Sequence, residues 1–600
     1  MEATTQTSDK PPEVLPRHSA CLLCRNRKVK CDGGQPNCGR CRASDQVCEY
    51  KYPLCASRTQ LLQDKIKDIE NKIRAIEQSR GSCSSLTSQT RSINSPPVSS
   101  PMTQQTPLSS PTSEACTTSP TPLVYDSISN LLDSDFASYP PSGCPWIEAA
   151  ISQRLASEGL DIPPNTLKNM LAIFVHRRGL SGYKLHMGRV LNNLITSSKP
   201  VLALLYAMLL TACHFAQDVE LKSWESALLE RTNSEIETNI VPAHQYGRGE
   251  YNCLYHLQAM LILSQYYYFK SRMLEGHVQT NNTTRFAVGM GIHQLNSRRI
   301  DDYKSKPSGK SGLQRERWQP RDSIELGEAI NLLWGCVARD LVGGIVNGLP
   351  PYLSLEEITT VWPLPLTTFV ENLDLPKDHY SVKELLDPDF SDVLADVSRD
   401  NAACLLIKVL VLIHYAGQLD TERFSKQELS HEWWARFNRY DRAIQRVAET
   451  LPPFGAGRDP EEFSHLVLAH TTIDCATLQL HGMLADHELK LEEVSNKSNR
   501  SLGGYSYARC VAACRKIASV TAYIEGIDLS YMHMFIAVTW ICAGNALAKY
   551  ISILRENNCN EEVHSMEQDM LVIDRNMELF LNTYPIFNAQ VERLRAIRNW

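Results

Sequence analysis

Six cysteines in one short polar segment constrain this chain more than any other feature of its 600 residues. Their spacing is Cys21-x2-Cys24-x6-Cys31-x6-Cys38-x2-Cys41-x6-Cys48. The pattern C-x2-C-x6-C therefore occurs twice. Two intervening residues let both sulfurs bind one metal ion across a tight turn, and six leave room for about one and a half turns of helix. Each half is predicted to be a turn, a short helix and an extended return.

The number of thiolates favours a binuclear zinc cluster. Two separate tetrahedral zinc ions need eight bonds, which six thiolates supply only if two sulfurs bridge both metals. The repeat suggests Cys21 and Cys38 as the bridges, because they occupy equivalent positions. One alternative is a disulfide framework, which the polar, signal-free opening of the chain makes unexpected. The other is a four-cysteine ribbon with two spare thiols, which would leave the repeated spacing without a reason.

The charge of the chain is unevenly distributed. Residues 1–80 contain fifteen Lys or Arg and ten Asp or Glu, whereas the whole chain carries −6. Between the second and third cysteines lie four basic residues, Arg25, Arg27, Lys28 and Lys30. Such side chains reach the guanine acceptors in the major groove, so this half is predicted to read DNA. Charge compensation of the cluster and nuclear import remain alternative roles, and both DNA reading and import predict a nuclear protein.

The segment Cys21–Cys48 resembles the Zn2Cys6 binuclear cluster of the fungal Gal4-like transcription factors, including the run RNRKVKCD and the proline of QPNC. This resemblance implies two Zn²⁺ per chain, held by all six cysteines, with Cys21 and Cys38 bridging. It also implies that Lys28, with Arg27 beside it, reads a CGG triplet in double-stranded DNA.

A heptad pattern follows the cysteines. Its apolar positions are Leu62, Ile66, Ile69, Ile73 and Ile76. This a/d spacing predicts a short coiled coil at residues 61–80 and hence a homodimer on a bipartite DNA site. A single amphipathic helix docked on the rest of the chain and a higher oligomer are the alternatives.

Composition predicts the remaining boundaries. We expect a disordered N-terminus at 1–17, a zinc module at 18–50, a linker at 51–60 and a disordered linker at 81–140. Residues 82–122 contain twenty Ser or Thr and seven Pro. The acidic, hydrophobic stretch Tyr125–Phe136 is either a coactivator-binding segment or a first docking helix.

From residue 145 to 600, which we call the body, helical periodicity dominates and predicts an all-α fold. The apolar run Val201–Ala216 is shorter than the roughly 18 residues that suggest a membrane span, so we expect a buried helix and no membrane partner. Pro145–Pro365 resembles the fungal transcription factor regulatory domain. Its matching positions, expected to be packing residues, are Trp334, Arg339, Asp340, Gly348, Pro350 and Pro351. That resemblance implies control of activation and binding of a small effector.

The overall prediction is a small binuclear zinc-cluster module plus a short coiled coil, a disordered linker and a large all-α helical domain. We found no phosphate loop, zinc-protease motif or nucleophile elbow, so no enzyme is expected. The expected function is a dimeric, pathway-specific activator of RNA polymerase II transcription in nutrient use or secondary metabolism. A zinc-stabilised scaffold protein, a repressor, and an enzyme with an unrecognised helical active site remain the alternatives.

Overall fold

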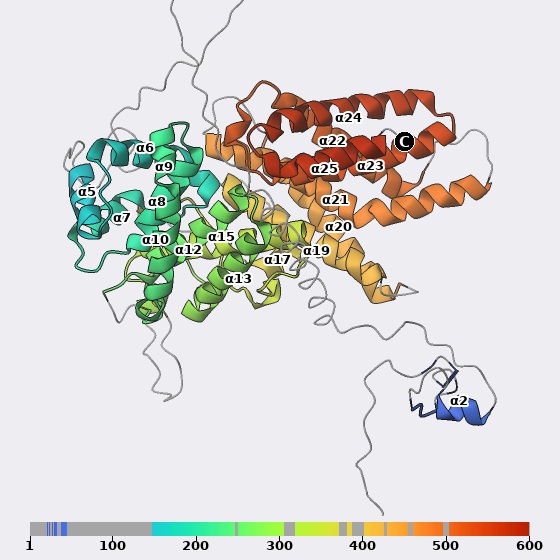
Figure 1. The fold of residues 1–600 in the computed structure, drawn as a ribbon. Coiled ribbons are helices and arrows are strands. Elements are labelled where there is room, and N and C mark those ends of the chain that lie inside the picture. Colours follow the sequence, from blue (N-terminus) through green and yellow to red (C-terminus); the bar gives the residue numbers. More distant parts are fainter. Residues whose placement is uncertain are drawn as a thin grey trace, which may run out of the picture. The chain divides into compact units, whose positions relative to one another are not determined.

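The computed structural model describes two separate units of the chain, Met1–Thr117 and Thr118–Trp600 (Figure 1). The described residues are 21, 23–24, 27, 29–32, 38–44, 147–246, 250–304, 318–370, 381–386, 401–424, 429–453, 460–495 and 503–598. The predicted N-terminus, coiled coil and both linkers lie outside them. So do the dimerisation positions Leu62, Ile66, Ile69, Ile73 and Ile76.

The first unit contains the zinc module. Its described elements are a helical turn at Leu23 and Cys24 and the short helix α2 (Gly39–Ala43). Each follows the first cysteine of a C-x2-C pair, as the repeat predicts. The buried cluster of this unit consists of cysteines, with Leu23 and Val29 packed beside them.

The described residues of the second unit form helices and no strand, which confirms the all-α prediction for this part of the body. In its first half the α-helices are α5 (Ile147–Ser157), α6 (Pro164–Ser181), α7 (Met187–Thr196), α8 (Leu202–Phe215), α9 (Val219–Ser223), α10 (Glu225–Thr238), α11 (Ile240–Ala243), α12 (Cys253–Phe269), α13 (Met273–Met290), α14 (Asp301–Lys304) and α15 (Ser323–Asn347). In the second half they are α16 (Leu366–Val370), α17 (Val382–Leu386), α19 (Ala402–Phe424), α20 (His431–Thr450), α21 (Pro460–Ser495), α22 (Tyr505–Tyr523), α23 (Ile536–Glu556), α24 (Asn560–Leu581) and α25 (Asn588–Arg598). Short 3₁₀ turns lie at Ile292–Gln294, Leu355–Glu357, Leu529–Tyr531 and Pro585–Phe587.

The core of the body is built around two helices that are largely apolar and buried on all sides. Helix α8, the predicted buried helix, is buried from Leu202 to Cys213, and every residue of α12 is buried. Such helices suit the centre of a large core, because they offer no polar face to water. Helix α20 is amphipathic instead, and it is capped by the preceding Ser430, whose side chain accepts the Trp433 N–H.

Packing links the helices in a continuous series. Helix α8 contacts α6, α10 and α12, and the series continues through α13 and α15 to α19. Helix α19 packs along α21, which also contacts α22 and α23. Figure 1 shows these green-to-red helices side by side, and the buried side chains form one hydrophobic cluster.

Within the described part of the chain, three helices, α15, α19 and α23, are long and apolar enough to cross a membrane by length and composition alone. In the most apolar 18 residues of each helix, the buried share is 78% for α15, 72% for α19 and 50% for α23. Packing against neighbouring helices therefore takes up much of their apolar surface.

Candidate zinc centre and DNA-contacting surface

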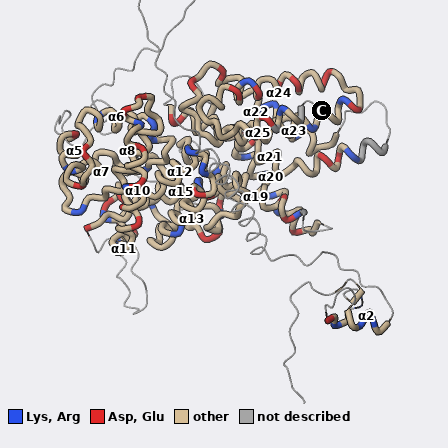
Figure 2. Tube along the Cα trace, in the orientation of Figure 1, with Lys and Arg blue, Asp and Glu red and all other residues tan. Residues whose placement is uncertain are grey.

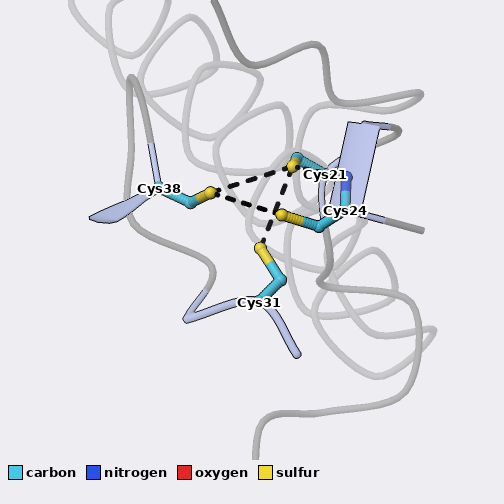
Figure 3. A group of neighbouring side chains, drawn as sticks. All are labelled: Cys21, Cys24, Cys31 and Cys38. Carbon is cyan, nitrogen blue, oxygen red and sulfur yellow. Dashed lines mark hydrogen bonds between the residues drawn. The ribbon is translucent and has the colours of Figure 1, made fainter. Parts of the chain in front are cut away.

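The described cysteines of the zinc module bring their sulfurs together. Figure 3 shows the side chains of Cys21, Cys24, Cys31 and Cys38 pointing toward one another, and their sulfurs lie within 4.8 Å of one another. The Sγ atom of Cys21 is 3.9 Å from that of Cys38 and 3.9 Å from that of Cys31, while Cys24 and Cys38 are 3.7 Å apart. Cys41 joins this group, 3.8 Å from Cys21.

These distances fit a zinc–thiolate centre. With Zn–S bonds of about 2.3 Å, neighbouring sulfurs of a tetrahedral site lie about 3.8 Å apart. Burial raises the pKa of the Cys24 thiol, so a bound cation is needed to keep it as a thiolate at neutral pH. The donor set is therefore suited to zinc in both spacing and chemistry.

Hydrogen bonding reproduces the repeat that the spacing predicts. The Cys24 N–H donates to Cys21 Sγ at 3.4 Å, and the Cys41 N–H donates to Cys38 Sγ at the same distance. In both halves the first sulfur thus caps the helical turn that follows it. Cys21 and Cys38 are equivalent in the structure as well as in the sequence, and backbone N–H donors stabilise negative charge on both.

Asp32 is a positioning residue that the sequence analysis missed. Its carboxylate accepts the Gly39 N–H at 2.8 and 3.0 Å and so caps α2 across the two halves. A Cβ at Gly39 would lie 2.7 Å from Asp32 Oδ2, which explains the glycine. An acidic residue directly after the third cysteine, with glycine directly after the fourth, was the available signal.

The described basic residues of the module lie on its surface. Arg27 and Lys30, two of the predicted DNA contacts, are exposed, as are Arg40 and Arg42 on α2. Figure 2 shows basic positions along α2. The other predicted contacts, Arg25 and Lys28, and the sixth predicted ligand, Cys48, lie outside the described residues.

In the body, the positions that carry the regulatory-domain resemblance have different roles. Trp334 is fully buried, stacks on Trp362 with ring centroids 4.5 Å apart and donates to the Val361 carbonyl. The Asp340 carboxylate accepts the Tyr352 N–H at 2.8 Å, which fixes the turn after α15. Both are packing residues, as expected. Arg339 lines a cavity, whose wall also includes Trp334.

A buried Ser–His–Asp network joins α20, α21 and α22. Ser506 Oγ lies 3.1 Å from His481 Nδ1, and His481 Nε2 lies 3.2 Å from Asp441 Oδ1. Hydrolases use this order of groups, but their nucleophile must be reached by substrate. Here His481 is 0% exposed, Ser506 is 4% exposed, and Arg509 also donates to Asp441 at 2.9 Å. We therefore interpret the network as a structural link between helices.

Two family models match the chain. Residues 19–56 match the fungal Zn(2)-Cys(6) binuclear cluster domain, and residues 171–439 match the fungal specific transcription factor domain. The second match begins later and extends further than the stretch Pro145–Pro365 on which the resemblance was noted.

Similar proteins are fungal transcription regulators. The depudecin biosynthesis cluster-specific transcription activator DEP6 of Fusarium langsethiae is 40% identical over 89 residues, 14% of each chain. The notoamide biosynthesis cluster transcriptional coactivator notQ' of Aspergillus versicolor is 43% identical over 68 residues, 10% of this chain and 13% of its own. The transcriptional regulatory protein pro1 of Neurospora crassa is 37% identical over 101 residues, 16% of this chain and 14% of its own.

These matches span only 13–14% of the length of each of these relatives. No solved structure matches the chain. The sulfur cluster and the helical body thus agree with the two domain matches: this chain carries a fungal Zn(2)-Cys(6) binuclear cluster domain, followed by a fungal specific transcription factor domain.

Proposed function

We propose that this chain is a sequence-specific DNA-binding transcription factor that regulates RNA polymerase II transcription in the nucleus. The observation that carries the proposal is the cluster of cysteine sulfurs, spaced for zinc, beside the exposed basic residues Arg27 and Lys30. A metal core with a basic surface is an arrangement suited to nucleic acid.

Two Zn²⁺ per chain hold the module together in this proposal. The spacing of the sulfurs supports Cys21, Cys24, Cys31 and Cys38 as the ligands of one ion. The second ion is assigned to Cys38, Cys41, Cys48 and the bridging Cys21. Zinc binding then supplies much of the folding free energy of the module, because its buried cluster contains little besides cysteine.

The basic segment after Cys24 is the proposed reader of CGG-type triplets. We assign direct base contact to Lys28 and support from Arg25, Arg27 and Lys30, whose charges also attract DNA phosphates. A homodimer formed through Leu62 and the four heptad isoleucines would place two readers on one DNA site.

The names of the relatives favour one kind of pathway. Three similar proteins are named as regulators of biosynthesis clusters, those of depudecin, notoamide and sorbicillinoids. We propose that this chain is likewise a pathway-specific activator for a secondary-metabolite gene set, acting through transcriptional coactivators. Its helical body regulates this activity.

Selection from random duplex DNA tests the proposal. The full-length, zinc-loaded chain is expected to enrich two CGG-like triplets, at a stated salt concentration because phosphate contacts make affinity salt-dependent. Enrichment of a single triplet would retain the reader and contradict the dimer. No enrichment from protein with two zincs bound would favour the zinc-stabilised scaffold.

Lys28→Gln tests the assigned reader. The variant should keep two zincs but lose about 1–3 kcal/mol of discrimination between CGG and mismatched triplets, because a specific base contact is removed. The matched control is Arg42→Gln, an exposed basic residue in the other half of the module. It should keep the wild-type preference. Equal preferences in both variants would assign base reading to another residue.

A further inference from the structure

A cavity of about 90 Å³ lies inside the body, lined from α6, α12, α15, α19 and α21 and from the segment before α23. Most of its wall is apolar, including Trp334, Leu406, Leu410 and Val538. A single water needs roughly 10–15 Å³ measured in this way, so the cavity has room for several waters or a small organic molecule.

Four basic side chains reach this apolar cavity from separate elements: Lys184, Arg339, His465 and His533. No Asp or Glu is among the described residues that line it. Lys184 also borders a second cavity of about 320 Å³, which shares Ala403 and Ile407 with the first. The cavity thus concentrates positive charge without a carboxylate on its own wall.

Arg339 is the central charge of the cavity. Its guanidinium donates to the Gln265 side-chain oxygen, and among the described residues it forms no ion pair with a carboxylate. Burial lowers its pKa to about 10, which leaves it charged at neutral pH. A desolvated charge without a counter-charge costs free energy, and an anion in the cavity would offset that cost.

The backbone makes room for this guanidinium. Helix α6 ends at Gly182, which has a φ of 75°, and a Cβ there would overlap Arg339. Glycine therefore serves both the left-handed helix end and the close approach of the charged side chain. Arg339 is held at the cavity wall by the fold itself.

The two histidines act as neutral hydrogen-bonding groups. Burial, reinforced by nearby cations that include Lys184, lowers the pKa of both His465 and His533 to about 3. His533 Nδ1 accepts the Phe535 N–H at 3.2 Å, so its neutral ring carries the proton on Nε2. That N–H is a suitable donor for a carboxylate oxygen.

We propose that this cavity binds a small organic anion, a carboxylate on an apolar body of about four to eight carbons, with Arg339 and Lys184 as its charge partners. The inference deepens the proposed function by naming the ligand class of the regulatory body. A carboxylate would supply the missing negative charge, and the apolar wall would cover the carbon chain.

Isothermal titration calorimetry on the full-length, zinc-loaded chain tests the proposal with three probes. They are 4-methylpentanoate, its uncharged amide 4-methylpentanamide, and inorganic phosphate. The carboxylate should bind one per chain and at least about tenfold more tightly than either other probe, because it alone satisfies both the charges and the apolar wall.

Variants test the assigned residues. Arg339→Gln and Lys184→Met should each weaken carboxylate binding at least about tenfold, because each removes a charge partner. Arg442→Gln, an exposed arginine on α20 outside the cavity, should bind as the wild type does. If Arg339→Gln does not fold, Lys184→Met alone tests the charge partners. Lys184 is only partly buried, so its replacement should leave the body folded.

Several results would overturn the proposal: no carboxylate binding at 10 mM probe, equal binding of acid and amide, equal binding of phosphate, or undiminished binding by the folded cavity variants. DNA selection with the same preparations tests the proposed DNA-binding function separately from carboxylate binding by the cavity. A wild-type chain that selects CGG triplets but binds no carboxylate refutes this inference alone. One that binds carboxylate but selects no DNA refutes only the DNA-binding function.

Discussion

Glu328 is a carboxyl group that the fold of the body removes almost completely from water. It is 2% exposed on α15, and its side chain accepts the His186 N–H at 2.9 Å. Burial raises its pKa to about 7. The folded chain therefore holds a proton that the unfolded chain releases at lower pH, so this residue makes the body lose stability as pH rises through 7.

Replacing Glu328 with Gln should remove that pH dependence. Glutamine keeps the acceptor for His186 but cannot ionise, so the free energy of unfolding should match the wild type near pH 4.5 and exceed it by about 1–3 kcal/mol at pH 8. Urea unfolding across this range measures the difference. Glu556→Gln, at an exposed position, is the control. Its free energy of unfolding should stay close to that of the wild type at every pH in this range. A variant less stable than the wild type at pH 8 would refute the burial argument.

At the scale of the element, α2 depends on two caps that come from different parts of the chain. Cys38 Sγ accepts the Cys41 N–H, and the Asp32 carboxylate accepts the N–H of Gly39, the first helical residue. A helix of five residues cannot be stable by itself. Its form is imposed by the buried cysteines and by Asp32.

Asp32→Ala should loosen the zinc module without removing a ligand. Loss of an N-terminal cap costs about 1 kcal/mol, which corresponds to release of zinc at roughly fivefold lower chelator concentration. Competition with a colorimetric chelator measures this shift. Asp32→Asn keeps one acceptor oxygen, so it should release zinc at a chelator concentration between those of the wild type and Asp32→Ala. Equal zinc retention in all three proteins would show that the cap does not stabilise the module.

Elements encoded by a local sequence pattern could be predicted, whereas contacts between residues distant in the sequence could not. The C-x2-C repeat predicted the paired helical turns and the sulfur cluster, and an apolar run predicted the buried helix α8. These are local patterns. The Asp32–Gly39 cap and the approach of Arg339 to Gly182 depend on residues that folding brings together. The cavity is likewise lined by basic side chains from four separate elements, two of them charged and two of them neutral histidines, which no single periodicity predicts.

At the scale of the whole molecule, the chain has two cores of different chemistry. The zinc module has a buried cluster of cysteines, whereas the body has a hydrophobic core of its own. Among the described residues, the group of side chains that could hold a metal ion is in the module. Removing zinc should therefore affect the zinc module, whereas the hydrophobic core gives the body a source of stability of its own.

Removing zinc with EDTA should abolish DNA binding and leave the body folded. We expect far-UV circular dichroism to keep nearly all of its helical signal, because the described helices of the body depend on apolar packing, and added zinc should restore DNA binding. Cooperative loss of the helical signal on chelation would show that the body also depends on a metal.

Surface mutations in the zinc module remove no core packing. Arg27, Lys30, Arg40 and Arg42 are exposed, while the buried cluster is made of cysteines with Leu23 and Val29 beside them. Exchanging an exposed basic residue thus leaves the metal ligands in place. Over evolutionary time such a module can change the DNA sequence it prefers without passing through unstable intermediates, so one regulator can acquire new target genes without any change in its helical body.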